Sequence, residues 1–171
     1  MSLIIEAEGK PIQVADISAR SGVHPTTIYR RWGTVERLVL DVAIERLQAA
    51  SEVAPSGSLR EDLMSYAERV VAATSGRDGF ALLRAVISAC GVDHGADDVG
   101  LLHLQRRGTE IQAMLDRFAD NPVTLADVFD GILAPIYMRV LFDIGDITEQ
   151  YLQGLVDRLI AARTPGTSGA Q

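Results

Sequence analysis

The chain of 171 residues contains a single cysteine, Cys90, and no apolar run long enough to span a bilayer. One cysteine excludes an internal disulfide framework. Cys90 lies in the apolar segment 85–90, which favours a buried structural thiol over the alternative of a redox sensor. No secretory leader is evident, so we expect a cytoplasmic protein with no membrane partner.

Common catalytic and cofactor signatures are also missing. No glycine-rich phosphate loop follows a strand pattern, no Gly-x-Ser-x-Gly elbow occurs, and the histidines have no evident nucleophile partner. The segment 93–98 concentrates aspartates around one imidazole, but its spacing is neither that of a zinc site nor that of an EF-hand. A linker followed by a helix cap accounts for it better. We expect no enzymatic activity, no metal and no cofactor.

No period-2 alternation is long enough to indicate a strand, whereas apolar residues recur at helical spacing throughout. Hydrophobic residues make up 47% of the chain, enough for a substantial core. The pattern therefore predicts an all-α protein with a disordered tail over 164–171. The expected helices cover 14–21, 25–32, 34–51, 58–74, 80–91, 97–118, 124–142 and 146–163. Their expected N-caps include His24, which is a poor one, Ser58 with Glu61, Thr124 with Asp127, and Asp146.

The segment 14–32 has the pattern of a helix-turn-helix. Gly22 tolerates the positive φ of a helix end, and Pro25 suits the first turn of the second helix. Ile28 and Trp32, four residues apart, should face inward. The outer side then carries hydroxyl and guanidinium groups that can contact phosphates and base edges in the major groove, with Tyr29 at its edge. From spacing alone, an ordinary helical hairpin with solvated arginines remains an alternative.

The run Ile28-Tyr29-Arg30-Arg31-Trp32, followed by 33–40, closely resembles the signature of the TetR family of bacterial transcriptional regulators. The segment 14–23 is similar to the first helix of that family's motif. The resemblance implies a three-helix DNA-binding head over 1–47 and a helical ligand-binding and dimerisation domain over 48–163. It also implies a homodimer that binds an inverted repeat in double-stranded operator DNA.

Carried over position by position, the resemblance places DNA contacts on the second helix and its flanks. The candidate DNA-binding residues are Gln13, Val14, Pro25, Thr26, Thr27, Tyr29, Arg30, Arg31, Thr34 and Arg37. Two departures stand out: the lysine that the family usually has after the turn is Val35 here, and the residues before Lys10 predict a truncated first helix.

Net charge is −7, which is unusual for a DNA-binding protein, but its distribution is uneven. Residues 1–47 carry six basic and six acidic side chains, so the whole excess lies beyond them. Arg30, Arg31 and Arg37 lie close together in sequence. A small positive face on the second helix is therefore compatible with the acidic total.

The segment 129–142 is apolar around nearly its whole circumference, so it must be covered on two sides. The resemblance extends to this segment and to 152–156, and implies a symmetric four-helix dimer interface. An intramolecular core is the alternative, and Pro135 should kink the helix. The candidate interface residues are Ile132, Ile136, Val140, Leu152, Leu155, Val156 and Leu159. For the effector site, the candidates are Met64, Tyr66, Phe80, Leu83, His103, Met114 and Phe118, each of which is more simply explained as core.

The sequence thus favours a dimeric repressor that a small hydrophobic molecule releases from its operator. A helical ligand-binding or scaffolding dimer that has lost DNA binding is the alternative.

Overall fold

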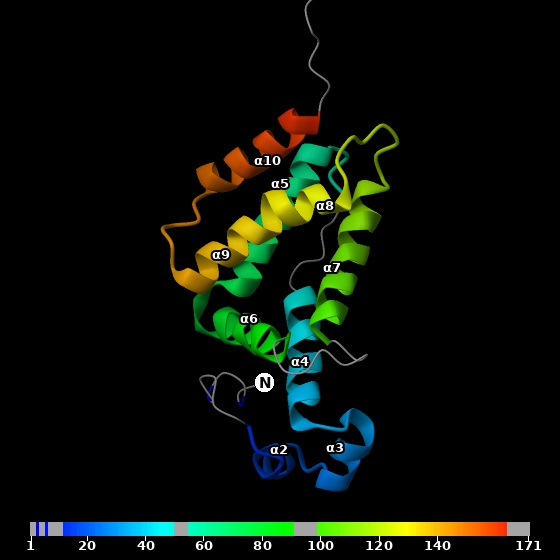
Figure 1. Cartoon of the computed structure of the whole chain (residues 1–171), viewed down its shortest axis with the longest axis vertical. Helices are drawn as coiled ribbons and strands as arrows, with labels where there is room; N and C mark the ends of the chain where they lie inside the picture. Colours follow the sequence, from blue (N-terminus) through cyan, green and yellow to red (C-terminus); the bar gives the residue numbers. More distant parts are fainter. Residues whose placement is uncertain (1–2, 4–5, 7–11, 50–54, 91–98, 164–171) are drawn as a thin grey trace, which may run out of the picture. The chain divides into compact units, whose positions relative to one another are not determined.

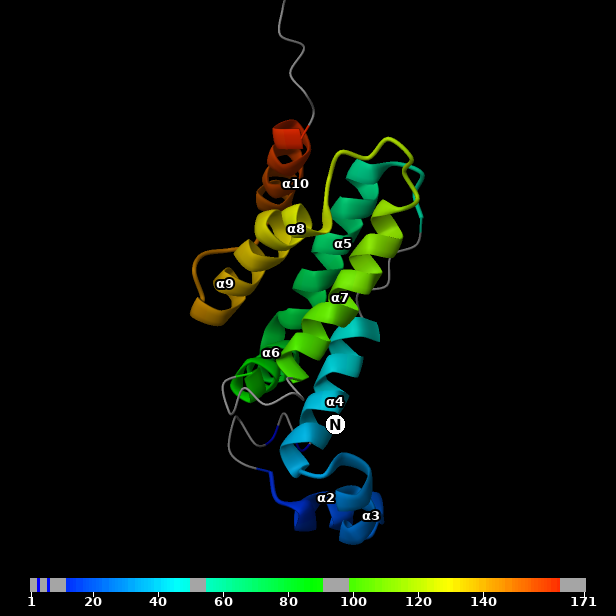
Figure 2. The same ribbon diagram turned by 45° about the vertical axis from the view of Figure 1, so that its right-hand side comes forward.

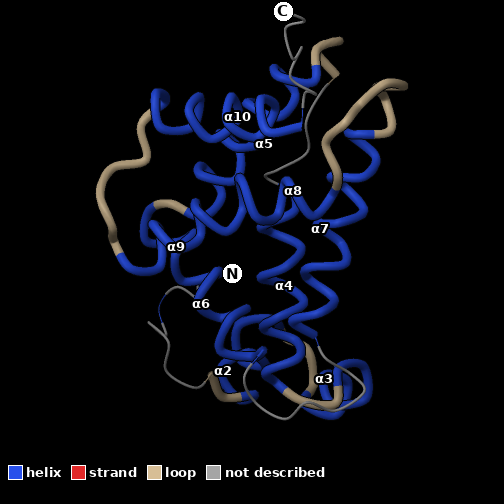
Figure 3. Tube along the Cα trace, turned by 45° about the horizontal axis from the view of Figure 1, so that its top comes forward, coloured by secondary structure: helices blue, strands red, loops and turns tan. Residues whose placement is uncertain are grey.

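A computed structural model describes Leu3, Glu6 and the ranges 12–49, 55–90 and 99–163, with side chains placed except at 48–49, 88–90 and 99–103. All regular structure within these ranges is helical (Figure 3). The fold class predicted from the sequence is confirmed. None of the described helices is both long and apolar enough to cross a membrane. The segment 93–98, the tail 164–171 and the side chain of Cys90 lie outside the described part.

The described helices are shown in two views (Figures 1 and 2). They are α2 (Val14–Ser21), α3 (Pro25–Trp32), α4 (Val35–Ala49), α5 (Leu59–Thr74), α6 (Gly76–Cys90), α7 (Val99–Leu115), α8 (Leu125–Val128), the π-helical turn η1 (Phe129–Leu133), α9 (Ala134–Phe142) and α10 (Glu149–Arg163).

The chain divides into two compact units. The first comprises Met1–Ala50 and Ala72–Arg107, and the second Ser51–Val71 and Gly108–Gln171. The first unit therefore contains more of the chain than the 1–47 segment that the sequence assigns to the DNA-binding head.

In the first unit, α4 packs against α6. Its core consists of Leu40, Ala43, Ile44 and Leu47 of α4 with Leu82 and Val86 of α6. Leu38 and Val42 of the same helix are only half-buried. Apolar residues surround most of α4, so its contact with α6 decides which stripe is buried.

The second unit is built around one larger core. Leu63 and Val70 of α5 pack with Ile111 and Met114 of α7 and with the buried faces of η1, α9 and α10. Several of these side chains have no exposed surface, including Leu63, Val70 and Ile111. The core thus joins segments that lie far apart in the sequence.

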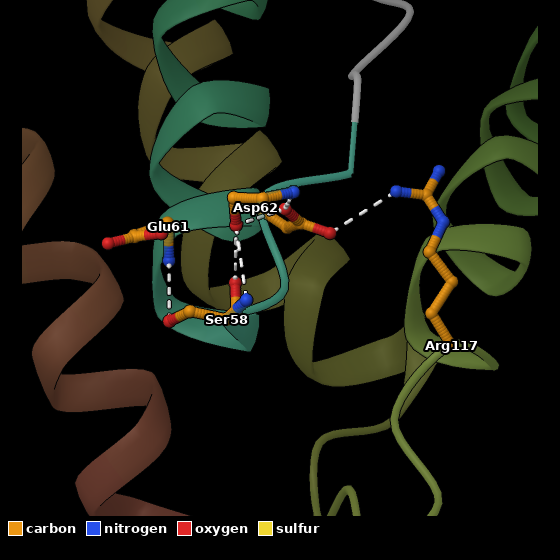
Figure 4. A network of polar contacts seen from close by, with 5 residues as sticks. Ser58, Glu61, Asp62 and Arg117 are labelled. Atoms are coloured by element: carbon orange, nitrogen blue, oxygen red, sulfur yellow. Dashed lines mark hydrogen bonds and ion pairs between the residues drawn. The ribbon is translucent and has the colours of Figure 1, made fainter.

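A buried carboxylate fixes the start of α5. Asp62, whose side chain is fully buried, accepts hydrogen bonds from the Ser56 amide at 2.8 Å and the Ser56 hydroxyl at 2.6 Å. Its other oxygen pairs with the guanidinium of Arg117 at 3.2 Å (Figure 4). The predicted Ser58 cap is present, since the Glu61 amide donates to the Ser58 hydroxyl at 3.5 Å. The Ser58 amide itself donates to Ser56 Oγ.

The last helices begin with hydroxyl caps. Thr124 and Asp127 form a reciprocal capping box at α8, as predicted. For α10 the predicted Asp146 cap is wrong, because Thr148 Oγ1 accepts from the Tyr151 amide at 3.2 Å. Ahead of Pro135 the chain forms the π-turn η1, with the Ala134 amide bonded to the Phe129 carbonyl. A wide turn at this place is consistent with a proline that lacks its own donor and crowds the preceding turn.

Candidate nucleic-acid interface

Helices α2 and α3 form a helix-turn-helix with the bounds that the sequence predicts. Gly22 ends α2 in the left-handed region, with φ of 71°, and its amide donates to the Ser18 carbonyl at 2.9 Å. This conformation is easy only for a residue without a Cβ, so Gly22 allows the chain to turn at once into α3.

The start of α3 is capped by a side chain. His24 is the N-cap, and its Nδ1 accepts from the Thr26 amide at 3.3 Å. Pro25 takes the first helical position, where a missing amide proton costs nothing. His24 is thus the N-cap that the sequence predicts, with its ring nitrogen in place of the usual side-chain oxygen.

The outer side of α3 is a row of exposed polar side chains above one buried anchor. Ile28 is 1% exposed, whereas Tyr29 is 47% exposed. The other outward groups are Thr26, Thr27, Arg30 and Arg31, all exposed. Threonine hydroxyls, a phenol and guanidinium groups are the donors that DNA phosphates and guanine edges accept.

One contact on α3 was not foreseen. The guanidinium of Arg31 lies over the indole ring of Trp32, 4.5 Å from its centroid. Trp32 Nε1 donates to a carboxylate oxygen of Asp41 in α4 at 3.2 Å. The sequence does not indicate the contact between Trp32 and Asp41, since these residues lie on different helices and meet only because of the turn between them.

The flanks of α3 supply further polar groups. Gln13 is the exposed N-cap of α2, and Val14 is half-buried at the first helical position. Thr34 Oγ1 accepts from the Arg37 amide at 3.2 Å and so caps α4, while the hydroxyl proton remains a donor. Val35, at the position where the resemblance expects lysine, is buried with 8% exposure. It serves the packing of α4.

Charge near the motif is partly paired. Arg20 of α2 makes a forked ion pair with Glu6, with contacts of 2.6 and 3.1 Å. Leu3 and Glu6 are both helical, and the contact of Glu6 with Arg20 links a residue before α2 to that helix. Hydrogen bonding to Glu6 is the main reason why the pKa of Arg20 is raised.

Most of the predicted dimer residues are buried within the single chain. Ile132, Ile136 and Val156 have no exposed surface within the single chain, and Leu152, Leu155 and Leu159 are also buried in its second unit. Within the single chain, α5, α7 and α10 cover the apolar helix, which favours the intramolecular core that the sequence left as the alternative. Only Val140 of that set is half-buried.

The predicted effector residues fall into both units. Tyr66 and Met114, each 2% exposed, lie in the core of the second unit, with Met64 packed against it. Phe118 is half-buried in the same unit. Leu83, 1% exposed, and Phe80, with Arg84 over its ring, belong to the first unit. The side chain of His103 lies outside the described part. Among the described residues, no cluster of three or more metal-ligating side chains occurs.

Comparisons with known proteins agree with this architecture. The sequence pattern of the family described as "Tetracyclin repressor-like, C-terminal domain" matches residues 53–159. The HTH-type transcriptional regulator AqdR of Rhodococcus erythropolis is 34% identical over 90 residues, which cover 52% of this chain and 44% of that protein. The chain thus matches less than half the length of AqdR.

Two further similarities extend over most of the chain. YdeS of Bacillus subtilis (strain 168), described as an uncharacterized HTH-type transcriptional regulator, is 21% identical over 160 residues, covering 90% of this chain and 80% of that protein. The crystal structure of the TetR family transcription regulator SCO0332 matches with a TM-score of 0.72 and 18% identity, covering 96% of this chain and 98% of that one.

Proposed function

Because the chain belongs to the TetR family of transcriptional regulators, we propose that it is a repressor that binds operator DNA through α3 and is released by a small hydrophobic effector. The observation that carries the DNA-binding part is the exposed polar row of Thr26, Thr27, Tyr29 and Arg30 above the buried Ile28. A short helix that presents such donors at the end of a helix-turn-helix fits the major groove.

Phosphate contacts flank the row on α3 in this proposal. The N-terminus of α2, at Gln13 and Val14, offers free amides and the positive end of the helix dipole. On the other side, Thr34 can donate its hydroxyl proton, and the exposed Arg37 lies in the first turn of α4. These groups would fix the position of α3 on the duplex, while α3 reads the sequence.

We propose that the effector binds within the core of the second unit, beside Met64, Tyr66 and Met114. Two methionines supply adaptable apolar surface, and the Tyr66 hydroxyl supplies a polar group for orienting a ligand. The effector would act by population shift, which requires tighter binding to the conformation that does not bind DNA.

A homodimer completes the proposal, since two copies of α3 on an inverted repeat multiply the affinity of a head whose own net charge is zero. Exposed apolar side chains of the second unit, Met138, Phe142 and Ile144, are candidates for that contact.

The test is a fluorescence-anisotropy titration of the full chain against labelled duplexes from the DNA upstream of its own gene, at fixed salt, with and without non-specific competitor. Competitor-resistant binding with two protomers per site is expected. Arg30→Ala should weaken it by about 5- to 150-fold, the range for one bidentate base contact. Binding that disappears with competitor would contradict the repressor and favour a helical ligand-binding dimer without a DNA role.

A further inference from the structure

The two adjacent arginines of α3 have different surroundings. Counting about 100° per residue, Thr26 and Arg30 lie about 160° and 200° from the buried Ile28. Arg31 lies only about 60° from Ile28 by the same count. Arg30 is therefore central on the outer face, and Arg31 is at its edge.

Arg31 is also held by its neighbour. Its guanidinium stacks on the Trp32 ring at 4.5 Å, an arrangement in which the cation is attracted to the π-face. The ring is in turn tied to α4, because Trp32 Nε1 donates to the half-buried Asp41 at 3.2 Å. The chain of contacts Asp41–Trp32–Arg31 restricts a side chain that would otherwise sample many rotamers.

We propose that Asp41 and Trp32 are positioning residues that hold the guanidinium of Arg31 for a phosphate of the DNA backbone, while Arg30 reads base edges. This inference rests on the proposed DNA-binding function. The N–H donors of a guanidinium lie in its own plane and point away from an aromatic ring beneath it, so Arg31 can bind a phosphate without leaving Trp32. The carboxylate of Asp41 accepts the indole hydrogen bond, although a negative charge near DNA is otherwise unfavourable.

The proposal predicts two kinds of loss. Arg31→Ala should weaken binding to an operator duplex and to a scrambled duplex of equal composition by similar factors, and should reduce the salt dependence by about one phosphate contact. Arg30→Ala should weaken operator binding far more than binding to the scrambled duplex.

Asp41 is tested by two variants that differ in one property. Asp41→Asn and Asp41→Ala both remove the negative charge, but only the asparagine keeps an acceptor for Trp32 Nε1. Asp41→Ala is expected to bind both duplexes about 2- to 5-fold more weakly than Asp41→Asn, the range for one exposed cation–π contact. The difference should vanish in the Arg31→Ala background, which a merely structural role of Asp41 would not predict.

Trp32 is the only tryptophan of the chain, so its fluorescence reports on this contact directly. Asp41→Ala should increase quenching of the indole by acrylamide, and Asp41→Asn should not. Trp32→Phe keeps an aromatic face but removes the indole donor, and is expected to match the loss of Asp41→Ala; it serves in its place if that variant does not fold.

The probe is the duplex that the wild-type chain enriches from a random pool, with its scrambled counterpart. A wild-type chain that enriches no duplex would overturn both the proposed function and this inference. Wild-type binding with equal affinities of the Asp41→Ala and Asp41→Asn chains, or an Arg31→Ala chain with undiminished affinity, would overturn only the inference.

Discussion

Arg107 is the largest fully buried side chain among the described residues, although arginine is among the residues least often buried. One of its guanidinium nitrogens donates to the Leu47 carbonyl at 3.0 Å. Leu47 lies in the last turn of α4, where carbonyls lack helical partners and the helix dipole is negative. A residue of α7 thus caps α4 from outside. Sequence spacing has no means of predicting this contact, because 60 residues separate the two positions.

We expect Arg107→Ala to lower the free energy of unfolding by about 3 kcal/mol, since it leaves a cavity and removes the hydrogen bond that caps α4. Arg107→Met fills the space and removes the cost of burying a charge, so it should recover at least half of that loss. Urea unfolding followed by circular dichroism measures both. If the methionine variant is as unstable as the alanine variant, the hydrogen bond to Leu47 contributes more than the packing.

The ionisation of Asp127 should make the free energy of unfolding depend on pH. Hydrogen bonds from Arg163 and then Thr124 lower the pKa of this carboxyl from 3.8 to about 2. A carboxyl with a lowered pKa in the folded state stabilises the fold above its unfolded pKa, and that contribution is lost as pH falls from about 4 towards 2. Because Arg163 is half-exposed, solvent screens the pair, and we expect about 1–2 kcal/mol.

Urea titrations of the wild-type and Asp127→Asn chains between pH 7 and pH 2 test this expectation. Their difference in unfolding free energy should be largest near neutrality and should shrink below pH 4. Asp157→Asn is the matched control, because the exposed Asp157 pairs with Arg60 at 2.7 Å in solvent and should show little change. A constant difference across the pH range would exclude the ionised Asp127 as its cause.

At the scale of single elements, the sequence predicts the bounds of a helix better than its buried face. The bounds of α2 and α3 follow from Gly22 and Pro25, whose backbone preferences act locally. The inward stripe of α4 does not follow from the sequence, because apolar residues occur on several of its sides. Only the tertiary contact with α6 selects Leu40 and Ile44 over Leu38 and Val42.

Two helical glycines differ in what a methyl group would meet. At Gly108 of α7 an added Cβ would lie 3.4 Å from a methyl of Leu125, an ordinary contact. At Gly131 of η1 it would lie 2.8 Å from Leu159 Cδ1, which is too close. A methyl group at Gly131 would therefore require the Leu159 side chain to shift.

Gly108→Ala is expected to stabilise the fold by about 0.5–1 kcal/mol through helix propensity. Gly131→Ala should destabilise it by about 1–2 kcal/mol, because Leu159 must leave its position in the core. Thermal and urea unfolding of the two variants, each against the wild type, measures the pair. Equal effects of the same sign would contradict the close packing of η1 and α10.

At the scale of the whole molecule, the sequence correctly indicated that the helix around Pro135 must be covered on two sides. It could not indicate whether a partner subunit or other helices of the same chain supply this cover, because either can bury an apolar helix. Burial of Ile132, Ile136 and Val156 within one chain assigns the cover to the core of the second unit. The proposed contact between copies then passes to side chains that this core leaves exposed.

The exposed apolar side chains of the second unit lie close together in the sequence, at the end of α9. Phe142 is 65% exposed, Met138 50% and Ile144 52%, at the end of α9 and in the loop that follows it. Arg139 holds this loop by donating to the Ile144 carbonyl at 2.6 Å, and its guanidinium lies 4.1 Å from the Tyr151 ring centroid. Large apolar groups fixed at the surface are typical of contact sites between proteins.

We therefore predict that Phe142→Glu shifts the chain from dimer to monomer, raising the dimer dissociation constant by at least about 30-fold, as for one central apolar contact. Sedimentation velocity over a concentration series measures this, and operator affinity should fall with it because two half-sites are no longer bound together. Ile87→Glu is the matched control, since Ile87 is 43% exposed but belongs to α6 of the first unit; it should leave sedimentation unchanged. Equal sedimentation of the Phe142→Glu and wild-type chains would place the dimer contact away from the end of α9.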